Sequence, residues 1–323
     1  MGYNLSLDCG GTKVMAILYD ETFRPLRQVR VGSVRPNTTS QELIRINLQK
    51  LEAGLFGAER PPLCRLSGIL PTPLVKALKE AHSIEEIVLL NELDLGLYAA
   101  RLFGNGILTI CGTGATVMAR VGDTFHIAGG YGASISDEGS GYWRGRLAFE
   151  AAIHHYEGRG DPTSLTDKIL QKIGGTNFRD AVSTVYTIPG ISPAAFVASC
   201  SQLVDEAAAE GDAVALEIIR RAGVSLGNMV NALTRKQSIP PEIPLTISGS
   251  VWKGHPLMLR EFRRTLQKET PMRQILIPDF EPIIGALIVH YHSLYGIFSD
   301  TDALMFKNLY PEFLFRVQEE RKD

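Results

Sequence analysis

Apolar and polar residues alternate in short stretches near the start of the chain. Residues 3–8 alternate up to Asp8, residues 13–19 form a second apolar stretch after Gly10-Gly11, and residues 25–31 form a third. Alternation with a period of two, bounded by glycine or turn residues, is typical of β-strands. We therefore predict three strands joined by tight turns at the start of an α/β fold.

Further elements follow at regular intervals. Leucine and isoleucine recur at helical spacing in residues 40–56, whereas residues 87–90 form an apolar strand that leads into a helix ending near Phe103. The remaining predictions are strands at 107–111, 116–121 and 245–248, helices at 143–156, within 194–237 and at 283–296, and a charged, loosely packed end at 310–323.

The order of strand, glycine turn and strand occurs twice. The first turn lies at Gly10-Gly11 and the second at 112–114, after a buried strand in each case. A repeat of this kind indicates a fold built from two similar lobes. We expect an N-terminal lobe over residues 1–110 and a C-terminal lobe over residues 111–296, and the pattern does not place the tail over 297–323.

Composition and charge exclude several classes. The 323 residues are 45% hydrophobic and 21% charged, with a formal net charge of −2, which lacks the basic excess of a nucleic-acid-binding surface. No apolar run reaches the roughly 18–20 residues that span a membrane, and no basic leader precedes the first strand, so we expect a cytoplasmic protein. The four cysteines are scattered without a CxxC pair, which argues against a structural zinc site or a disulfide framework.

The first glycine turn carries candidate chemistry. In the stretch Asp8-Cys9-Gly10-Gly11-Thr12-Lys13, the two glycines let backbone N–H groups approach a phosphate without an intervening Cβ. Thr12 adds a hydroxyl donor, and Asp8 is a candidate ligand of Mg²⁺ through water. An ordinary β-turn without a ligand is the alternative.

Three further motifs follow along the chain. A second glycine turn occurs at Gly112-Thr113-Gly114, and an acidic pair at 137–138 precedes a helix, where a simple N-cap is the alternative. A strand ends at Ser248-Gly249-Ser250-Val251, where small residues leave room for an adenine or a ribose.

The order of these motifs resembles the actin, hexokinase and heat-shock-70 ATPase superfamily, and within it the N-acetylglucosamine kinases and the BadF/BadG/BcrA/BcrD-type ATPases. The matching stretches are 8–13, 112–115, 129–132, 137–143, 248–251 and 282–286. The resemblance implies a two-lobed, actin-like (ribonuclease H-like) α/β fold with ATP and Mg²⁺ in a cleft between the lobes.

The resemblance also implies roles for individual residues. Glu92 stands where the family has its catalytic aspartate, one methylene further from the backbone; Asp94 follows at about 200° around the helix, so the two cannot face the same way. The implied sugar-binding residues are Asn37, Asn91, Gly130, Asp137 and Glu138. The implied nucleotide-binding residues are Gly10, Gly11, Thr12, Lys13, Gly112, Thr113, Gly114, Gly249 and Ser250, with Glu92 and Asp8 as the catalytic pair.

The implied activity is ATP-dependent phosphorylation of an amino sugar, at the 6-hydroxyl of N-acetylglucosamine or a close relative, by an enzyme that could form homodimers. Two alternatives stay open at this point. One is an ATPase that activates a redox enzyme. Activators that resemble this fold carry cysteines that share an iron–sulfur cluster across a dimer, and Cys111 and Cys200 do not match such a pair. The other is a sugar sensor without turnover, which the exchange of aspartate for Glu92 makes conceivable.

Overall fold

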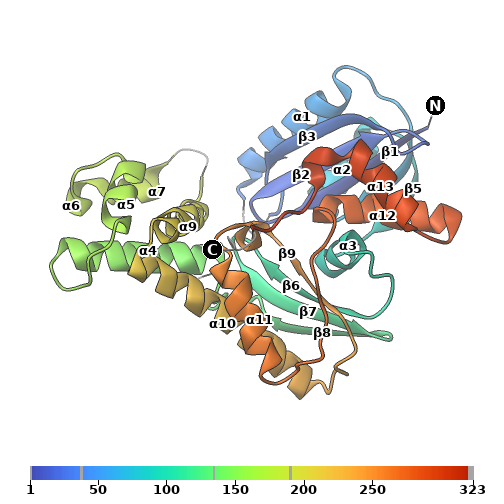
Figure 1. Cartoon of the computed structure of the whole chain (residues 1–323). Helices are drawn as coiled ribbons and strands as arrows, with labels where there is room; N and C mark the ends of the chain where they lie inside the picture. Colours follow the sequence, from blue (N-terminus) through green and yellow to red (C-terminus); the bar gives the residue numbers. More distant parts are fainter. Residues whose placement is uncertain (1, 37–38, 134, 189–190, 319–323) are drawn as a thin grey trace. The chain divides into compact units, whose positions relative to one another are not determined.

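The computed structural model describes residues 2–36, 39–133, 135–188 and 191–318. The chain divides into two compact units, and most of their helices and strands are labelled in Figure 1. Unit 1 comprises Met1–Phe103 and Ile277–Phe315, and unit 2 comprises Gly104–Leu276 and Arg316–Asp323. The lobes were predicted over 1–110 and 111–296, whereas residues 104–110 fall in unit 2 and residues 277–296 in unit 1.

Unit 1 is built on a mixed five-stranded sheet with the order β3-β2-β1-β4-β5. The first three strands are antiparallel, and β4 and β5 run parallel to β1. The strands are β1 (Tyr3–Cys9), β2 (Lys13–Tyr19), β3 (Pro25–Gly32), β4 (Leu63–Gly68) and β5 (Ile84–Leu89). The helices of the unit are α1 (Gln41–Phe56), α2 (Thr72–Ala81), α3 (Glu92–Ala99), α12 (Pro282–Tyr295), α13 (Asp300–Leu309) and the 3₁₀ turn η2 (Pro311–Phe313).

Unit 2 repeats this sheet. Its order is β10-β9-β6-β7-β8, with an antiparallel β6-β7-β8 meander and β9 and β10 parallel to β6. The strands are β6 (Gly106–Cys111), β7 (Ala115–Val121), β8 (Thr124–Gly129), β9 (Leu245–Ser248) and β10 (Ile275–Leu276). The helices are α4 (Gly141–Tyr156), α5 (Leu165–Ile173), α6 (Phe178–Ala181), α7 (Thr184–Thr187), α8 (Pro193–Ser199), α9 (Ser201–Ala209), α10 (Ala213–Lys236), α11 (Leu257–Gln267) and the 3₁₀ turn η1 (Ser250–Lys253).

The duplication extends to one glycine in each sheet. Gly68 ends β4 with φ +123°, and a Cβ added there would overlap the carbonyl oxygen of Leu7 on the adjacent β1. Gly249 follows β9 with φ +105°, and a Cβ there would overlap the carbonyl oxygen of Cys111 on the adjacent β6. Each position excludes a side chain both sterically and through its backbone conformation. The prediction of two similar halves is thus confirmed.

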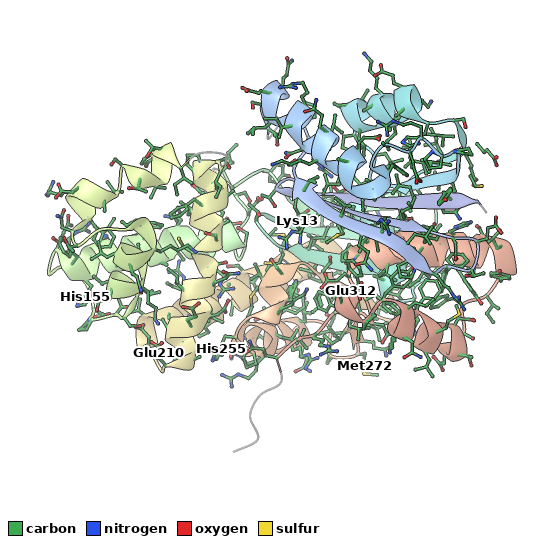
Figure 2. All side chains as sticks on the ribbon, turned by 90° about the horizontal axis from the view of Figure 1, so that it is seen from above. Lys13, His155, Glu210, His255, Met272 and Glu312 are labelled. Atoms are coloured by element: carbon green, nitrogen blue, oxygen red, sulfur yellow. The ribbon has the colours of Figure 1, made fainter. Side chains whose placement is uncertain are left out.

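The end of the chain is packed more tightly than its charge suggests. Tyr310 is fully buried, its hydroxyl donates to the Phe23 carbonyl at 2.6 Å, and Phe313 is 5% exposed. Gln28 on β3 donates to Glu312, whose position Figure 2 marks. The expectation of a loosely packed end is wrong for residues 310–315, because their aromatic side chains complete an apolar cluster of unit 1. Within the described parts of the chain, no helix combines the length and apolar character needed to span a bilayer.

Candidate functional site

The first glycine turn of unit 1 joins β1 to β2. The Gly10 N–H donates to the Lys13 carbonyl at 2.9 Å, and the Ser33 hydroxyl donates to the Gly10 carbonyl at 3.2 Å. A Cβ added at Gly11 would meet no atom of the chain within 4 Å. Packing therefore does not require this glycine, which leaves open space where an anion can approach the backbone. Thr12 and Lys13 are exposed beside it, and Figure 2 marks Lys13 at the start of β2.

Asp8 lies at the base of this turn and is half-buried. Burial raises the pKa of its carboxyl from 3.8 to about 6, the Lys13 ammonium partly offsets this rise, and the Glu92 carboxylate adds to it. An ionised Asp8 is therefore costly in the unliganded protein. A cation beside it would remove that cost.

Glu92 is brought to the first turn by an arginine. Its Oε1 lies 2.5 Å from Nη2 of Arg35, whose Nε donates to the Cys9 carbonyl at 2.7 Å. Glu92 is the first residue of α3, which follows β5 after Leu90 and Asn91, and its carboxylate is close enough to Asp8 to raise the pKa of that residue; its role as the proton acceptor stays a prediction. The sequence pattern did not indicate Arg35; in that loop it indicated Asn37, which lies outside the described residues.

The neighbouring polar residues begin the helix. The Asn91 Oδ1 accepts from the Asp94 N–H at 2.9 Å, and the Asp94 Oδ2 accepts from the Asn91 N–H at 3.1 Å. This reciprocal capping box satisfies two backbone donors at the start of α3. Asp94 thus caps the start of α3. The Asn91 side-chain oxygen is engaged in the cap, so its predicted contact with a sugar would fall to its amide nitrogen.

The second glycine turn, in unit 2, is held by the start of α4. The Gly112 N–H donates to the Gly114 carbonyl at 2.9 Å, and the first two N–H groups of α4, from Gly141 and Tyr142, donate to the carbonyls of Gly112 and Thr113 at 2.8 and 3.2 Å. A Cβ at Gly112 would again meet nothing within 4 Å. The turn therefore combines a fixed backbone with open space, as the first turn does.

Asp137 supports the second turn from inside. It is 4% exposed, has φ +68°, and accepts hydrogen bonds from the N–H groups of Gly132 and Ala115. Burial raises the pKa of its carboxyl, and these hydrogen bonds oppose the rise. A Cβ at Gly114 would come within 2.6 Å of its Oδ2, so this glycine makes room for the carboxylate. Contact between Asp137 and a sugar stays a prediction.

The other predicted sugar residues lie close by in sequence. Gly130 has φ +73°, and its N–H donates to the Ala115 carbonyl at 3.1 Å. Glu138 is exposed, and its carboxylate accepts from the Ser136 hydroxyl at 3.3 Å. Among the hydrogen bonds described for these residues, Glu138 therefore does not support the second glycine turn as Asp137 does.

An ion pair between α4 and α9 contacts the backbone just after the segment predicted to receive the adenosine, because its aspartate also accepts from the chain directly after η1. Gly249 contacts β6, and Ser250 begins η1. Arg144 on α4 is fully buried, and its Nη2 lies 2.5 Å from the Asp205 Oδ1, which also accepts from the His255 N–H at 2.9 Å. Sequence analysis missed this pair. The sequence feature that could have indicated it is an arginine at a buried position of the helix, three residues before Leu147.

Comparisons with known proteins agree with the sequence patterns. Residues 5–289 match the model of the BadF/BadG/BcrA/BcrD ATPase family. An N-acetylmuramic acid/N-acetylglucosamine kinase of Clostridium acetobutylicum is 26% identical over 302 residues, which cover 90% of this chain and 98% of that protein. An N-acetyl-D-glucosamine kinase of Dictyostelium discoideum is 28% identical over 192 residues, 58% of this chain and 60% of that protein.

Solved structures share the fold. A putative N-acetylglucosamine kinase from Chromobacterium violaceum superposes with a TM-score of 0.64 at 22% identity, covering 90% of this chain and 99% of its own. One from Porphyromonas gingivalis gives 0.63 at 21% identity, with coverages of 91% and 100%. These likenesses confirm the predicted two-lobed α/β fold.

Proposed function

Since the chain belongs to the BadF/BadG/BcrA/BcrD ATPase family, we propose that it transfers the γ-phosphoryl group of ATP to a hydroxyl of an amino sugar. The 6-hydroxyl of N-acetylglucosamine or a close relative is the proposed acceptor. The relative from Clostridium acetobutylicum, named a kinase of two such sugars, supports this proposal over nearly its full length. The observation that carries it is the pair of carboxylates, Asp8 and Glu92, beside a glycine turn with open space at Gly11.

Each group has a defined part in such a transfer. Phosphoryl transfer depends on positioning and on neutralising charge, rather than on covalent help from the protein. We assign the backbone N–H groups near Gly11 and Gly112, together with the Lys13 ammonium, to the phosphates. The Glu92 carboxylate would accept the proton of the attacking hydroxyl, so that the sugar oxygen bonds to the γ-phosphorus while the bond from that phosphorus to the β–γ bridging oxygen breaks and ADP leaves.

The donor set fits a magnesium ion held mainly by phosphate and water. No group of three or more histidine, cysteine or acidic side chains gathers into a metal cage in the described parts of the chain. Mg²⁺ characteristically keeps several waters and takes one or two carboxylates plus substrate phosphates. Asp8 would provide such a carboxylate: burial disfavours its ionised form and so raises its pKa, and a neighbouring cation would favour that form. When bound, the ion would neutralise charge on the phosphates.

The redox-activator alternative finds less support. Such activators hold an iron–sulfur cluster through cysteine thiolates, whereas the relatives from Clostridium acetobutylicum and Dictyostelium discoideum are both named amino sugar kinases. Because a sugar kinase consumes ATP, we expect this protein to act in the cytoplasm, where ATP is supplied.

A screen of sugar-dependent ADP release tests the proposed function. The purified protein is incubated with ATP, Mg²⁺ and, one at a time, N-acetylglucosamine, glucosamine, N-acetylmannosamine and N-acetylmuramic acid, and the phosphorylated position is then identified by NMR. We expect one or more of these sugars to accelerate ADP release, and the Glu92→Gln variant to show little acceleration. ADP release that no amino sugar changes would refute the proposal, and sugar binding without turnover would instead identify a sensor.

A further inference from the structure

Arg35 lies where the two carboxylates of unit 1 and the first glycine turn meet. Its Nη2 contacts the Glu92 Oε1 at 2.5 Å, and its Nε donates to the Cys9 carbonyl at 2.7 Å. It also acts electrostatically on Asp8. One guanidinium therefore connects the proposed proton acceptor directly to the backbone that begins the glycine turn.

The backbone that carries Arg35 is itself anchored. The Arg35 N–H donates to the Ser33 hydroxyl at 3.2 Å, and that hydroxyl lies 3.2 Å from the Gly10 carbonyl, to which it donates. Asn47 on α1 donates from its side chain to the Ser33 carbonyl at 2.9 Å. Segment 33–35 is thus fixed both to α1 and to the turn, so the guanidinium projects from a defined position.

Stability alone does not account for this pair. The Arg35 and Glu92 side chains are 26% and 38% exposed, and ion pairs at such exposure contribute little to stability. Glutamate has one more rotatable bond than aspartate, so an unrestrained Glu92 would sample several carboxylate positions at the start of α3. A planar guanidinium fixed at Nε can restrict that freedom, whereas a lysine ammonium would lack the second contact.

We propose that Arg35 is a positioning residue that holds the Glu92 carboxylate in register with the first glycine turn. The proposal rests on the proposed function, because the carboxylate is positioned for proton transfer from the acceptor hydroxyl. Misplacement of a reacting group by about 1 Å can lower turnover about a hundredfold. Loss of Arg35 should therefore lower kcat more than it changes the KM for ATP.

A double-mutant cycle tests this role. Arg35→Gln is compared with Arg35→Lys, with Glu92→Gln, and with the double variant Arg35→Gln/Glu92→Gln; Arg30→Gln, an exposed arginine on β3, is the matched control. We expect Arg35→Gln to lower kcat at least about tenfold with the KM for ATP within about threefold. Arg35→Lys should fall closer to the glutamine variant than to the wild type. In the Glu92→Gln background, the same change at Arg35 should alter kcat less than about threefold, because no base is left to position.

Two kinetic results would overturn the proposal. One is a folded Arg35→Gln variant whose kcat stays within about twofold of the wild type. The other is an equal loss of kcat in the presence and absence of the Glu92 carboxylate, which would show that Arg35 acts on another group, such as the transferred phosphate.

A measurement without turnover separates this proposal from the proposed function. The Nε–H group of Arg35 can be followed by ¹⁵N NMR, with the signal assigned through its loss in Arg35→Gln. Glu92→Gln should shift that signal, and Arg30→Gln should leave it in place. A signal unmoved by Glu92→Gln would overturn the contact whatever the enzyme does. A wild type that phosphorylates no sugar would refute the proposed function, and with it the positioning of a base, even if the signal moved.

Discussion

Replacing Asp8 with asparagine should stabilise the fold while it impairs catalysis. Burial raises the pKa of Asp8 from 3.8 to about 6, so near pH 7.5 the folded protein holds an anion that the unfolded chain solvates better. A shift of about two units corresponds to about 3 kcal/mol of unfolding free energy. The side chain is only half-buried, and asparagine loses the attraction of the Lys13 ammonium, so we expect a gain of about 1–3 kcal/mol.

The gain should depend on pH with a defined sign. A folded-state pKa above the unfolded value means that the stability contributed by protonated Asp8 is complete below pH 3.8 and is lost as the pH rises through about 6. Between these two pH values, the free energy of unfolding of the wild type should therefore drop progressively below that of Asp8→Asn. The difference between the two proteins should reach its plateau above about pH 6.5.

Urea denaturation at a series of pH values measures this difference, with the midpoint and slope fitted at each pH. Asp20→Asn is the matched control. Although burial alone would raise the pKa of Asp20, hydrogen bonds from Thr22 and from the Arg24 N–H outweigh it and lower this pKa. Asp20→Asn should therefore destabilise the protein at neutral pH, opposite in sign to Asp8→Asn.

The reasoning fails if Asp8→Asn is less stable than the wild type at pH 7.5, or if the difference between them does not vary between pH 4 and 7. Turnover gives a second check. Without the carboxylate, sugar-dependent ADP release should fall by at least about a hundredfold, whereas sugar affinity should stay near its wild-type value. Wild-type turnover in the Asp8→Asn variant would remove Asp8 from the proposed mechanism.

Three further outcomes are expected. Glu92→Gln should lower kcat about 10²–10⁴-fold, whereas Asp94→Asn should leave kcat nearly unchanged and lower the free energy of unfolding by about 1 kcal/mol through loss of the helix cap. Steady-state kinetics and urea denaturation measure the two effects, and the reverse pattern would assign the base to Asp94 and the cap to Glu92. Gly11→Ala should fold normally, because its added Cβ enters open space, but should bind ATP more weakly in a titration, because that space is the proposed phosphate site. Gly249→Ala should lower the thermal midpoint strongly, because its Cβ would overlap the Cys111 carbonyl. Equal stability of the two variants would contradict this. Burial lowers the pKa of His290 from 6.5 to about 4. The contribution of neutral His290 to stability should therefore be complete above pH 6.5 and be lost as the pH falls through 4. A His290→Gln variant with the wild-type pH dependence in urea denaturation would refute this.

Local patterns sufficed for much of the fold. Strands bounded by glycine, such as β1 and β6, could be predicted because alternation and turn residues act over a few positions. Several elements were not predicted, among them the strands β4, β8 and β10 and the helices α2, α5, α11 and α13. The chain end was misjudged, because Tyr310 joins its cluster through contacts with residues near position 20, which no local pattern reveals.

The candidate site shows the same limit. Asp8 and Glu92 could be identified as candidates from motif order, since Asp8 lies near the end of β1 before the first glycine turn and Glu92 begins the helix that follows β5. The ion pair between Arg35 and Glu92 joins residues 57 positions apart, so only the folded chain reveals it. The backbone of Asp137 is equally hard to foresee, because φ +68° is uncommon for a residue other than glycine.

The interrupted course of unit 1 has a consequence for how the protein is made. Its cluster around Tyr19 and Phe23 includes Phe280 and Phe306, which leave the ribosome only after the whole of 104–276 has been synthesised. Until then, apolar surface of the first hundred residues stays uncovered, whereas the main segment of unit 2 is already available to fold. We therefore expect unit 2 to fold before unit 1, the reverse of the usual order in which N-terminal domains fold first. The nascent N-terminal segment is where aggregation or chaperone binding would concentrate.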